Sequence, residues 1–400
     1  MSAAGRTDLD APAVSDVAAA LRDAPFVRLF ASADGDALAA AGVLARALDD
    51  IGRPFQVAVV ETASESDARI EAGDGDATAL TIGLAPTAVE RADALSLPGT
   101  DRPASRSAFE TARELGADPD PVLALAGVIA AGETPGAGET GPVLDAARDA
   151  GVERRPGVGT PTADLADGLA HTTLAHASFS GDPGPAQATL AELGLPAELD
   201  EDARRRVASL FALDATETDA APERAADAVE RALRPHAAPE SAPFETVEGY
   251  ADVLDAVAAD APGTGVALAL GHDARTDALD TWRARAANAH RSVREATTGR
   301  YDGLFVARVD AADVNDASRE NAPVRTIARL LRDFRSPEPV AMAVSNDEAA
   351  VAATGDSDVA AALAAAVDEV GGEAAGDATR GYARFEGDTK AFIAAFRGSL

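Results

Sequence analysis

Short apolar runs and amphipathic segments alternate over the first hundred residues of the chain. The runs at 25–32, 54–62, 77–84 and 94–97 predict buried strands, and the segment 38–52 between the first two has helical periodicity. Strands and helices that alternate in this order are typical of a parallel α/β sheet. Ligands of such sheets bind at the carboxyl ends of the strands, so the turn after residue 32 is the first candidate site.

The pattern becomes mostly helical from 144 to 233, and a second α/β region follows it. Residues 234–243 are rich in proline and alanine, which predicts a linker. Beyond them, apolar runs at 265–271, 304–310, 339–346 and 381–387 predict strands separated by helices. We therefore expect a disordered terminus at 1–15, a first domain at 16–233 that includes the helical part, and a smaller α/β domain at 244–400.

Acidic residues outnumber basic ones, 67 Asp and Glu against 35 Lys and Arg, which gives a formal net charge of −32. Lys390 is the only lysine, and this composition is typical of proteins adapted to molar intracellular salt. Counterion release contributes little to nucleic-acid binding in molar salt, so the negative charge does not exclude DNA or RNA as a partner. The chain has no cysteine, which excludes disulfides and thiolate zinc sites and favours the reducing cytoplasm. It also has no run of 18 apolar residues, so neither a membrane span nor an export signal is expected.

Two carboxylates, Asp34 and Asp36, stand two residues apart in the turn after the first predicted strand. Carboxylate oxygens suit Mg²⁺ and Mn²⁺, so this pair is a candidate ligand set for one such ion. Aspartate is also common in turns and at helix N-termini. In that alternative, Asp36 caps the following helix and Asp34 sits in the turn. The five histidines are scattered without metal-ligand spacing, which favours packing roles.

The stretch 32–48 resembles the start of the DHH phosphoesterase superfamily, which includes the RecJ single-strand exonucleases and the RecJ-related subunit of the replicative helicase. That superfamily begins with a strand, then H-x-D-x-D-G, then a small-residue helix. The resemblance places Ser32 at the family histidine and Asp34 and Asp36 at the two aspartates. The remaining motif positions carry other residues than the family ligands: Ala37 at the glycine, Gly83 at the second-motif aspartate, residues 98–100 at D-H-H, and Ala131 at the fourth-motif aspartate.

The second half of the chain resembles the DHH-associated domain. Arg325, Arg329, Arg332 and Arg335 recur at spacings of four, three and three, so they form one stripe along a helix. The stripe is a candidate for phosphate contact, and intramolecular pairing with the abundant carboxylates is the equal alternative. Residues 371–387 stand where the family has a glycine loop that binds phosphate, with Asp377 at its histidine. The loop supplies further candidates for nucleic-acid binding: Gly371, Gly372, Arg380, Tyr382 and Arg384, with Tyr382 and Phe385 for base stacking.

The resemblance implies a protein of DNA replication or repair from a salt-loving archaeon. Two-metal hydrolysis needs a fuller ligand set than the two aspartates that remain, so we expect a pseudoenzyme that requires no cofactor and binds Mn²⁺ or Mg²⁺ weakly at most. Its expected partners are single-stranded DNA or RNA and replication proteins of the GINS or MCM type.

Two alternatives stay open at this point. The first is an active Mn- or Mg-dependent single-strand exonuclease or phosphodiesterase that takes its missing ligands from Asp101, Glu133 or Asp377. The second is a scaffold protein that binds no nucleic acid.

Overall fold

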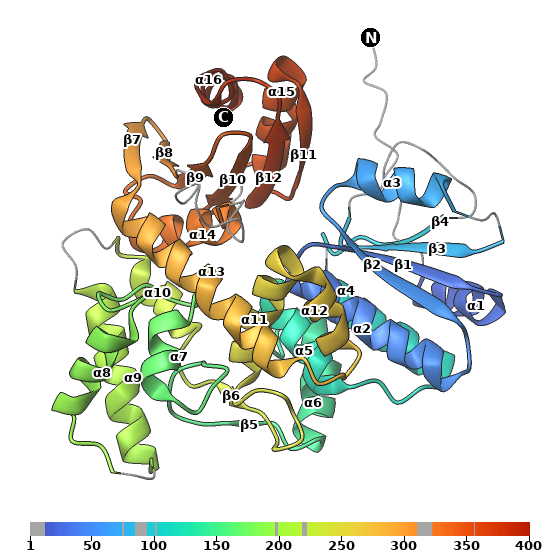
Figure 1. The fold of residues 1–400 in the computed structure, drawn as a ribbon, viewed down its shortest axis with the longest axis horizontal. Helices are drawn as coiled ribbons and strands as arrows, with labels where there is room; N and C mark the ends of the chain where they lie inside the picture. The colour runs from blue at the N-terminus through green and yellow to red at the C-terminus, as the bar shows by residue number, and fades with distance from the viewer. Residues whose placement is uncertain are drawn as a thin grey trace.

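A four-stranded parallel sheet forms the centre of the N-terminal domain (Figure 1). The computed structural model describes residues 13–73, 76–84, 94–100, 102–196, 199–217, 222–309, 322–355 and 357–400. The sheet has the strand order β2-β1-β3-β4, and every neighbouring pair is parallel. Its strands are β1 (Val27–Ser32), β2 (Phe55–Val60), β3 (Thr78–Ile82) and β4 (Ala94–Leu97). This confirms the parallel sheet that the apolar runs predict.

Small residues allow the helices of this domain to pack closely. α2 (Gly35–Asp50) is rich in alanine and almost wholly buried, and it packs against α4 (Ala104–Leu115) and α5 (Pro121–Ala130). A Cβ added at Gly127 of α5 would lie 2.5 Å from the Cβ of Ser105 in α4, so glycine is required at this crossing. α1 (Val14–Asp23) also packs on α4, whereas α3 (Ala63–Glu71) follows β2. α1 starts within the terminus that we expected to be disordered, of which residues 1–12 lie outside the described residues.

The predicted helical part is present between the two sheets in the order of the chain. It contains η1 (Gly138–Thr140), α6 (Gly141–Asp149), α7 (Leu165–His171), α8 (Pro183–Glu192), α9 (Glu201–Thr216) and α10 (Ala225–Glu230). Two short strands, β5 (Glu153–Arg154) and β6 (His236–Ala237), pair with each other. β6 lies in the predicted linker, and its His236 is buried. The segment 234–243 is therefore part of the packed structure.

Residues 244–271 differ from the predicted arrangement. α11 (Val247–Asp260) and α12 (Pro262–Ala269) pack on α2, and α11 also packs on α5, so they share the core of the N-terminal domain rather than that of the second one. The predicted strand at 265–271 falls largely in α12. Pro262 begins that helix, where the missing N–H costs nothing, and a short apolar run fits a buried helix as well as a strand.

The C-terminal domain is a six-stranded mixed sheet of order β11-β12-β10-β9-β8-β7, in which only the β8–β9 pair is parallel. The long helix α13 (Arg275–Glu295) leads from the N-terminal core into it (Figure 1). One sheet face packs with α14 and the helical part, and the other packs with α15 and α16. The elements are β7 (Thr297–Tyr301), β8 (Leu304–Arg308), α14 (Val324–Phe334), β9 (Val340–Val344), β10 (Glu348–Ala353), α15 (Val359–Val370), β11 (Gly372–Gly376), β12 (Arg380–Phe385) and α16 (Thr389–Ser399).

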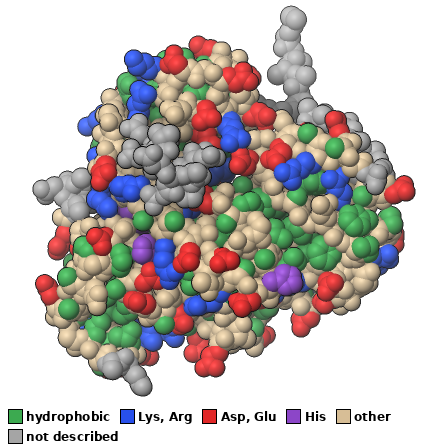
Figure 2. All heavy atoms as spheres, in the orientation of Figure 1, with side chains coloured by type: hydrophobic (Ala, Val, Ile, Leu, Met, Phe, Trp, Pro, Cys, Tyr) green, Lys and Arg blue, Asp and Glu red, His purple; other side chains and the backbone are tan. Residues whose placement is uncertain are grey.

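Acidic side chains are spread over the visible surface, with basic side chains between them (Figure 2). Within the described parts of the chain, no helix is both long enough and apolar enough to cross a membrane.

Candidate functional site at the carboxyl edge of the N-terminal sheet

Asp34 and Asp36 each hold the N-terminus of a helix. Asp34 is the N-cap of α2, where one of its carboxylate oxygens accepts the backbone N–H of Ala37 at 2.8 Å and the other accepts the hydroxyl of Ser32. Asp36 points to α4 instead, where its two oxygens accept the N–H groups of Ala104 and Ser105 at 2.6 and 2.9 Å. The capping alternative expected Asp36 to cap the helix that follows. Instead, Asp34 caps that helix, α2, and Asp36 binds the N-terminus of α4.

Burial affects the charge of Asp36. The side chain is 7% exposed, and this burial, together with the nearby charge of Asp34, raises the pKa of Asp36 to about 7. The two backbone N–H groups of α4 act in the opposite direction, because they favour the ionised carboxylate.

A third carboxylate, Asp255 of α11, lies beside this turn. Its Oδ1 accepts the backbone N–H of Gly35 at 2.7 Å, and burial raises its pKa to about 6. The sequence analysis missed this residue. One signal in the sequence could have identified Asp255: it is an acidic residue in a helix whose other positions are largely apolar. A carboxylate that such a helix buries in the core needs a hydrogen-bond partner there.

Positions 83 and 99, which the resemblance assigns to metal ligands of the family, lie close to Ser32 and Asp36. A Cβ added at Gly83, where φ is +74°, would lie 2.5 Å from Ser32 Oγ and 2.8 Å from the Cβ of Ala37. A Cβ added at Gly99 would lie 3.5 Å from the Cα of Gly83 and 3.7 Å from Asp36 Oδ2. The backbone of the site is therefore assembled, but the space where a larger side chain at position 83 would begin is already filled.

These residues do not fit a two-metal site. All four oxygens of Asp34 and Asp36 already accept hydrogen bonds, and Gly83 and Ala131 have no ligand atoms in their side chains. Among the residues that the structure describes, no group of three or more His, Asp or Glu side chains could hold a metal ion. This search includes Glu133 and Asp377, whereas Asp101 lies outside the described residues.

Most of the predicted arginine stripe serves internal contacts. Arg329 donates to Thr173 Oγ1 at 2.9 Å, Arg332 forms an ion pair with Asp333 at 2.7 Å, and Arg335 donates to the carbonyl of Val293. Arg325 alone of the four is exposed, and its guanidinium lies 4.1 Å from the centre of the Tyr382 ring. Pairing with a carboxylate therefore describes Arg332, whereas Arg329 and Arg335 donate to neutral oxygens. Arg325 is exposed over Tyr382.

The predicted glycine loop is a β-hairpin whose aromatic residues are covered. Tyr382 is 9% exposed beneath Arg325, and Phe385 stacks on Phe392 with ring centres 4.3 Å apart, so neither presents a free face to a base. Gly371 ends α15, and a Cβ at Gly372 would lie 2.0 Å from the Arg384 carbonyl oxygen. These glycines thus serve the turn from helix to strand, and base stacking on Tyr382 or Phe385 is not supported.

Two arginines of β12 reach the N-terminal domain. Arg380 donates to the carbonyl of Ala131 at 2.6 Å, and Arg384 forms an ion pair with Glu61 at 2.9 Å. Side chains alternate along a strand, so Arg380, Tyr382 and Arg384 lie on the same face of β12. The C-terminal domain therefore presents positive charge to the edge of the sheet at which the two aspartates lie.

Four of the five histidines, His171, His176, His236 and His290, take packing roles away from this edge. His236 pairs with Glu248 at 2.7 Å, and His171 contacts Asp167 at 3.0 Å. The Nδ1 atoms of His176 and His290 lie 2.9 Å apart, and His290 Nε2 lies 3.1 Å from the carbonyl of Thr172. A carbonyl only accepts, so His290 donates through Nε2 and accepts from His176 through Nδ1, with both rings neutral.

This histidine pair predicts a loss of stability in mild acid. Burial, assisted by the charges of Arg294 and Arg335, lowers the pKa of His176 to about 4. The unfolded chain takes up this proton near pH 6.5, so the free energy of unfolding falls between pH 6.5 and 4, by about 2 to 3 kcal/mol for this group. His176→Gln should reduce the slope of unfolding free energy against pH by about one proton in denaturant titrations.

The exposed His272 provides the control for that measurement, since His272→Gln also removes one imidazole. An equal change of slope in both variants would contradict the assignment to the buried pair.

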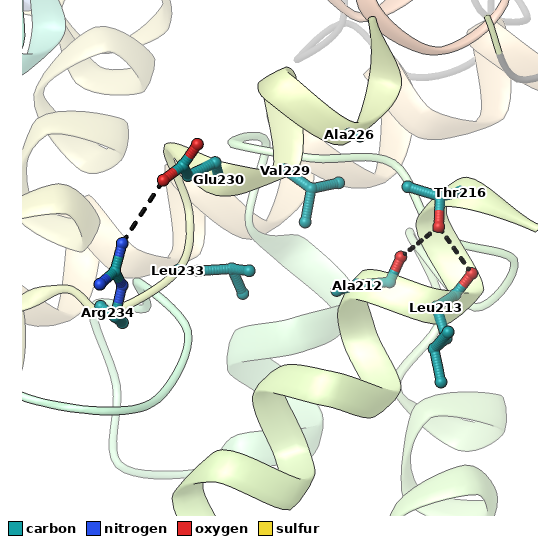
Figure 3. Close-up of a pocket in the computed structure, with 8 residues that line it drawn as sticks. All are labelled: Ala212, Leu213, Thr216, Ala226, Val229, Glu230, Leu233 and Arg234. Atoms are coloured by element: carbon teal, nitrogen blue, oxygen red, sulfur yellow. Dashed lines mark hydrogen bonds and ion pairs between the residues drawn. The ribbon is translucent and has the colours of Figure 1, made fainter. Parts of the chain in front are cut away.

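An apolar pocket of about 390 Å³ lies between α9 and α10, apart from this edge (Figure 3). Leu213, Val229 and Leu233 line it, and Glu230 and Arg234 form an ion pair at 3.4 Å. Thr216 in its wall donates to the carbonyl of Ala212 at 2.7 Å. Its polar groups are thus paired with one another, and we assign it no chemistry.

Comparison with solved structures places this architecture among RecJ-like proteins. CDC45 from Entamoeba histolytica aligns with 96% of this chain and 98% of its own at a TM-score of 0.60 and 10% identity. Exonuclease RecJ bound to manganese aligns with 99% of this chain and 95% of its own at a TM-score of 0.51 and 15% identity. RecJ in complex with Mn²⁺ from Thermus thermophilus aligns at a TM-score of 0.55 and 14% identity, with 98% of this chain covering 54% of that one. At these identities the likeness shows the fold alone.

Sequence comparison identifies a much nearer relative. "Uncharacterized protein rrnAC1427" from Haloarcula marismortui is 52% identical over 401 residues, which cover 100% of both chains. The family described as "Uncharacterized protein rrnAC1427, C-terminal domain" matches residues 296–398, which begin at the end of α13 and include the whole second sheet. The fold is similar to that of RecJ and CDC45, and the chain belongs to the same family as rrnAC1427 of Haloarcula marismortui.

Proposed function

We propose that the protein binds single-stranded DNA between its two sheet domains and does not hydrolyse it. The observation that carries this proposal is the placement of Arg325, Arg380 and Arg384 around Tyr382, opposite the carboxyl edge of the N-terminal sheet. Guanidinium groups bind phosphate oxygens in a bidentate manner, and an arginine plane can also stack on a base.

The residues at the carboxyl edge of the N-terminal sheet are the reason why we expect no hydrolysis. Asp34 and Asp36 use their oxygens to hold α2 and α4, and the residues at the other family ligand positions cannot complete a cage for two ions. The protein thus binds without a required metal. The likeness in fold to CDC45 and to RecJ supports a role in DNA replication or repair, with partners of the GINS or MCM type as part of this proposal.

Binding and cleavage can be measured together on labelled single-stranded DNA in molar KCl with Mn²⁺. We expect a rise in fluorescence anisotropy, no shortened products, and an unfolding midpoint that Mn²⁺ leaves unchanged, because a bound ion would raise it. Arg325→Gln should weaken binding about threefold to tenfold, as expected for loss of one phosphate or stacking contact. Arg397→Gln is the matched control, because Arg397 also lies over a tyrosine, 3.9 Å from the ring centre of Tyr301, but on α16.

DNA cleavage that disappears in Asp34→Ala would establish the alternative of an active exonuclease. An absence of binding to DNA and RNA in the same buffer would favour the scaffold.

A further inference from the structure

The N-terminal domain places its own acceptors against the two arginines of β12. Glu61 directly follows the last residue of β2, the neighbour of β1, so its carboxylate lies at the same sheet edge as Asp34. It contacts Arg384 Nη1 at 2.9 Å. Ala131, at the end of α5, offers its carbonyl to Arg380 at 2.6 Å. An anionic and a neutral oxygen of the protein thus occupy these donors.

Each of the two arginines also has a carboxylate of the C-terminal domain beside it. Glu348 of β10 stands directly opposite Arg384 in the sheet, and its largely buried carboxylate accepts from Arg384 Nη2 at 3.2 Å. Asp377, in the turn of the hairpin, lies 3.7 Å from Arg380 Nε. Arg384 would therefore keep its hydrogen bond to Glu348 if Glu61 moved away, and a new anion would meet an oriented donor.

The ion pair between Glu61 and Arg384 can be replaced by a pair between Arg384 and a phosphate at little cost. The side chains of Glu61 and Arg384 are each 43% exposed, and ion pairs at such exposure contribute little to stability. A phosphodiester carries the same single charge as a carboxylate and accepts from the same fork of N–H groups. A DNA phosphate can replace Glu61 without leaving a buried charge unpaired.

We propose that Arg384 and Arg380 form a phosphodiester-binding position, and that Glu61 occupies it in the DNA-free protein and competes with the DNA backbone for it. This inference rests on the proposed function and adds the regulation of the same surface. Glu61 acts as an internal substitute for phosphate and lowers the affinity of the protein for single strands.

Removal of the charge of Glu61 tests the competition directly. Glu61→Gln should bind a labelled oligothymidine about three- to fivefold more tightly than the unaltered protein in molar KCl, and Arg384→Gln should bind it more weakly. Glu201→Gln is the control for net charge, because Glu201 is an exposed partner of Arg205 on α9. Inorganic phosphate, added as a competitor, should reduce binding by both Glu61→Gln and the unaltered protein.

The outcomes separate the two proposals. Binding by the unaltered protein with no gain in Glu61→Gln would overturn the competition and leave the proposed function intact. Binding that is seen only in Glu61→Gln would support the competition. Absence of binding by every variant would overturn the proposed function, and the competition with it. An equal gain in Glu201→Gln would mean that net charge and not this position sets the affinity.

Discussion

Gly83→Ala should lower the free energy of unfolding by about 2 to 5 kcal/mol, whereas Gly52→Ala should cost only about 1 to 2 kcal/mol. Both glycines have a left-handed backbone, with φ of +74° and +69°, so both substitutions carry the same conformational cost. They differ in surroundings. The new methyl at 83 would lie 2.5 Å from Ser32 Oγ, whereas a Cβ at 52 meets no atom within 4 Å.

Denaturant titrations of the two variants in molar KCl measure the difference. Equal costs would show that the space around Ser32 and Ala37 does not restrict position 83. A double variant, Ser32→Gly with Gly83→Ala, should regain part of the loss, because it removes the nearer of the two contacts and leaves that with Ala37.

This pair of positions also explains why the edge cannot simply regain a metal ligand. The resemblance places Ser32 at the family histidine and Gly83 at a family aspartate, and here the serine hydroxyl takes the space in which a side chain at 83 would begin. The Ser32 hydroxyl donates to Asp34, which also caps α2. An aspartate introduced at 83 would have to displace Ser32, whose hydroxyl donates to Asp34.

The sequence predicted the N-terminal sheet because its strands are short apolar runs separated by helical periodicity. The role of Asp36 was beyond such reasoning, since its partner Ala104 is 68 residues away and belongs to a helix with no capping residue of its own. Local patterns also missed β10, because alanine, which makes up most of this strand, is uncommon in strands. They predicted a strand where α12 lies, because a short apolar run fits either structure. Tertiary packing decided both elements.

The arginine stripe shows the same limit at the candidate site. Helical spacing correctly groups Arg325, Arg329 and Arg332 on α14, because that relation is local. Their exposure depends on what packs against the helix: Thr173 from the helical part contacts Arg329, and Tyr382 from β12 lies beneath Arg325. Spacing alone thus identifies candidate residues, and the neighbouring elements decide which of them can meet a ligand.

Asp252 holds together three elements that meet between the domains. Its carboxylate, on α11, accepts from the backbone N–H of Thr173 at 2.9 Å, from the Thr173 hydroxyl at 2.5 Å and from Trp282 Nε1 of α13 at 2.8 Å. Arg329 of α14 donates to the same threonine hydroxyl. The Asp252 side chain is 5% exposed, so water cannot replace it.

Asp252→Ala should therefore lower the free energy of unfolding by about 3 to 5 kcal/mol, because it leaves buried donors without an acceptor. Trp282 is the only tryptophan of the chain and is fully buried, so its fluorescence reports this junction in the same titration. Asp280→Ala is the control, since Asp280 lies on the same helix as Trp282 but is mostly exposed and pairs with Arg283; it should cost at most about 0.5 kcal/mol. If Asp252→Ala costs no more than this control and leaves the emission of Trp282 unchanged, the carboxylate does not hold α11 to α13, and the junction depends on apolar packing alone.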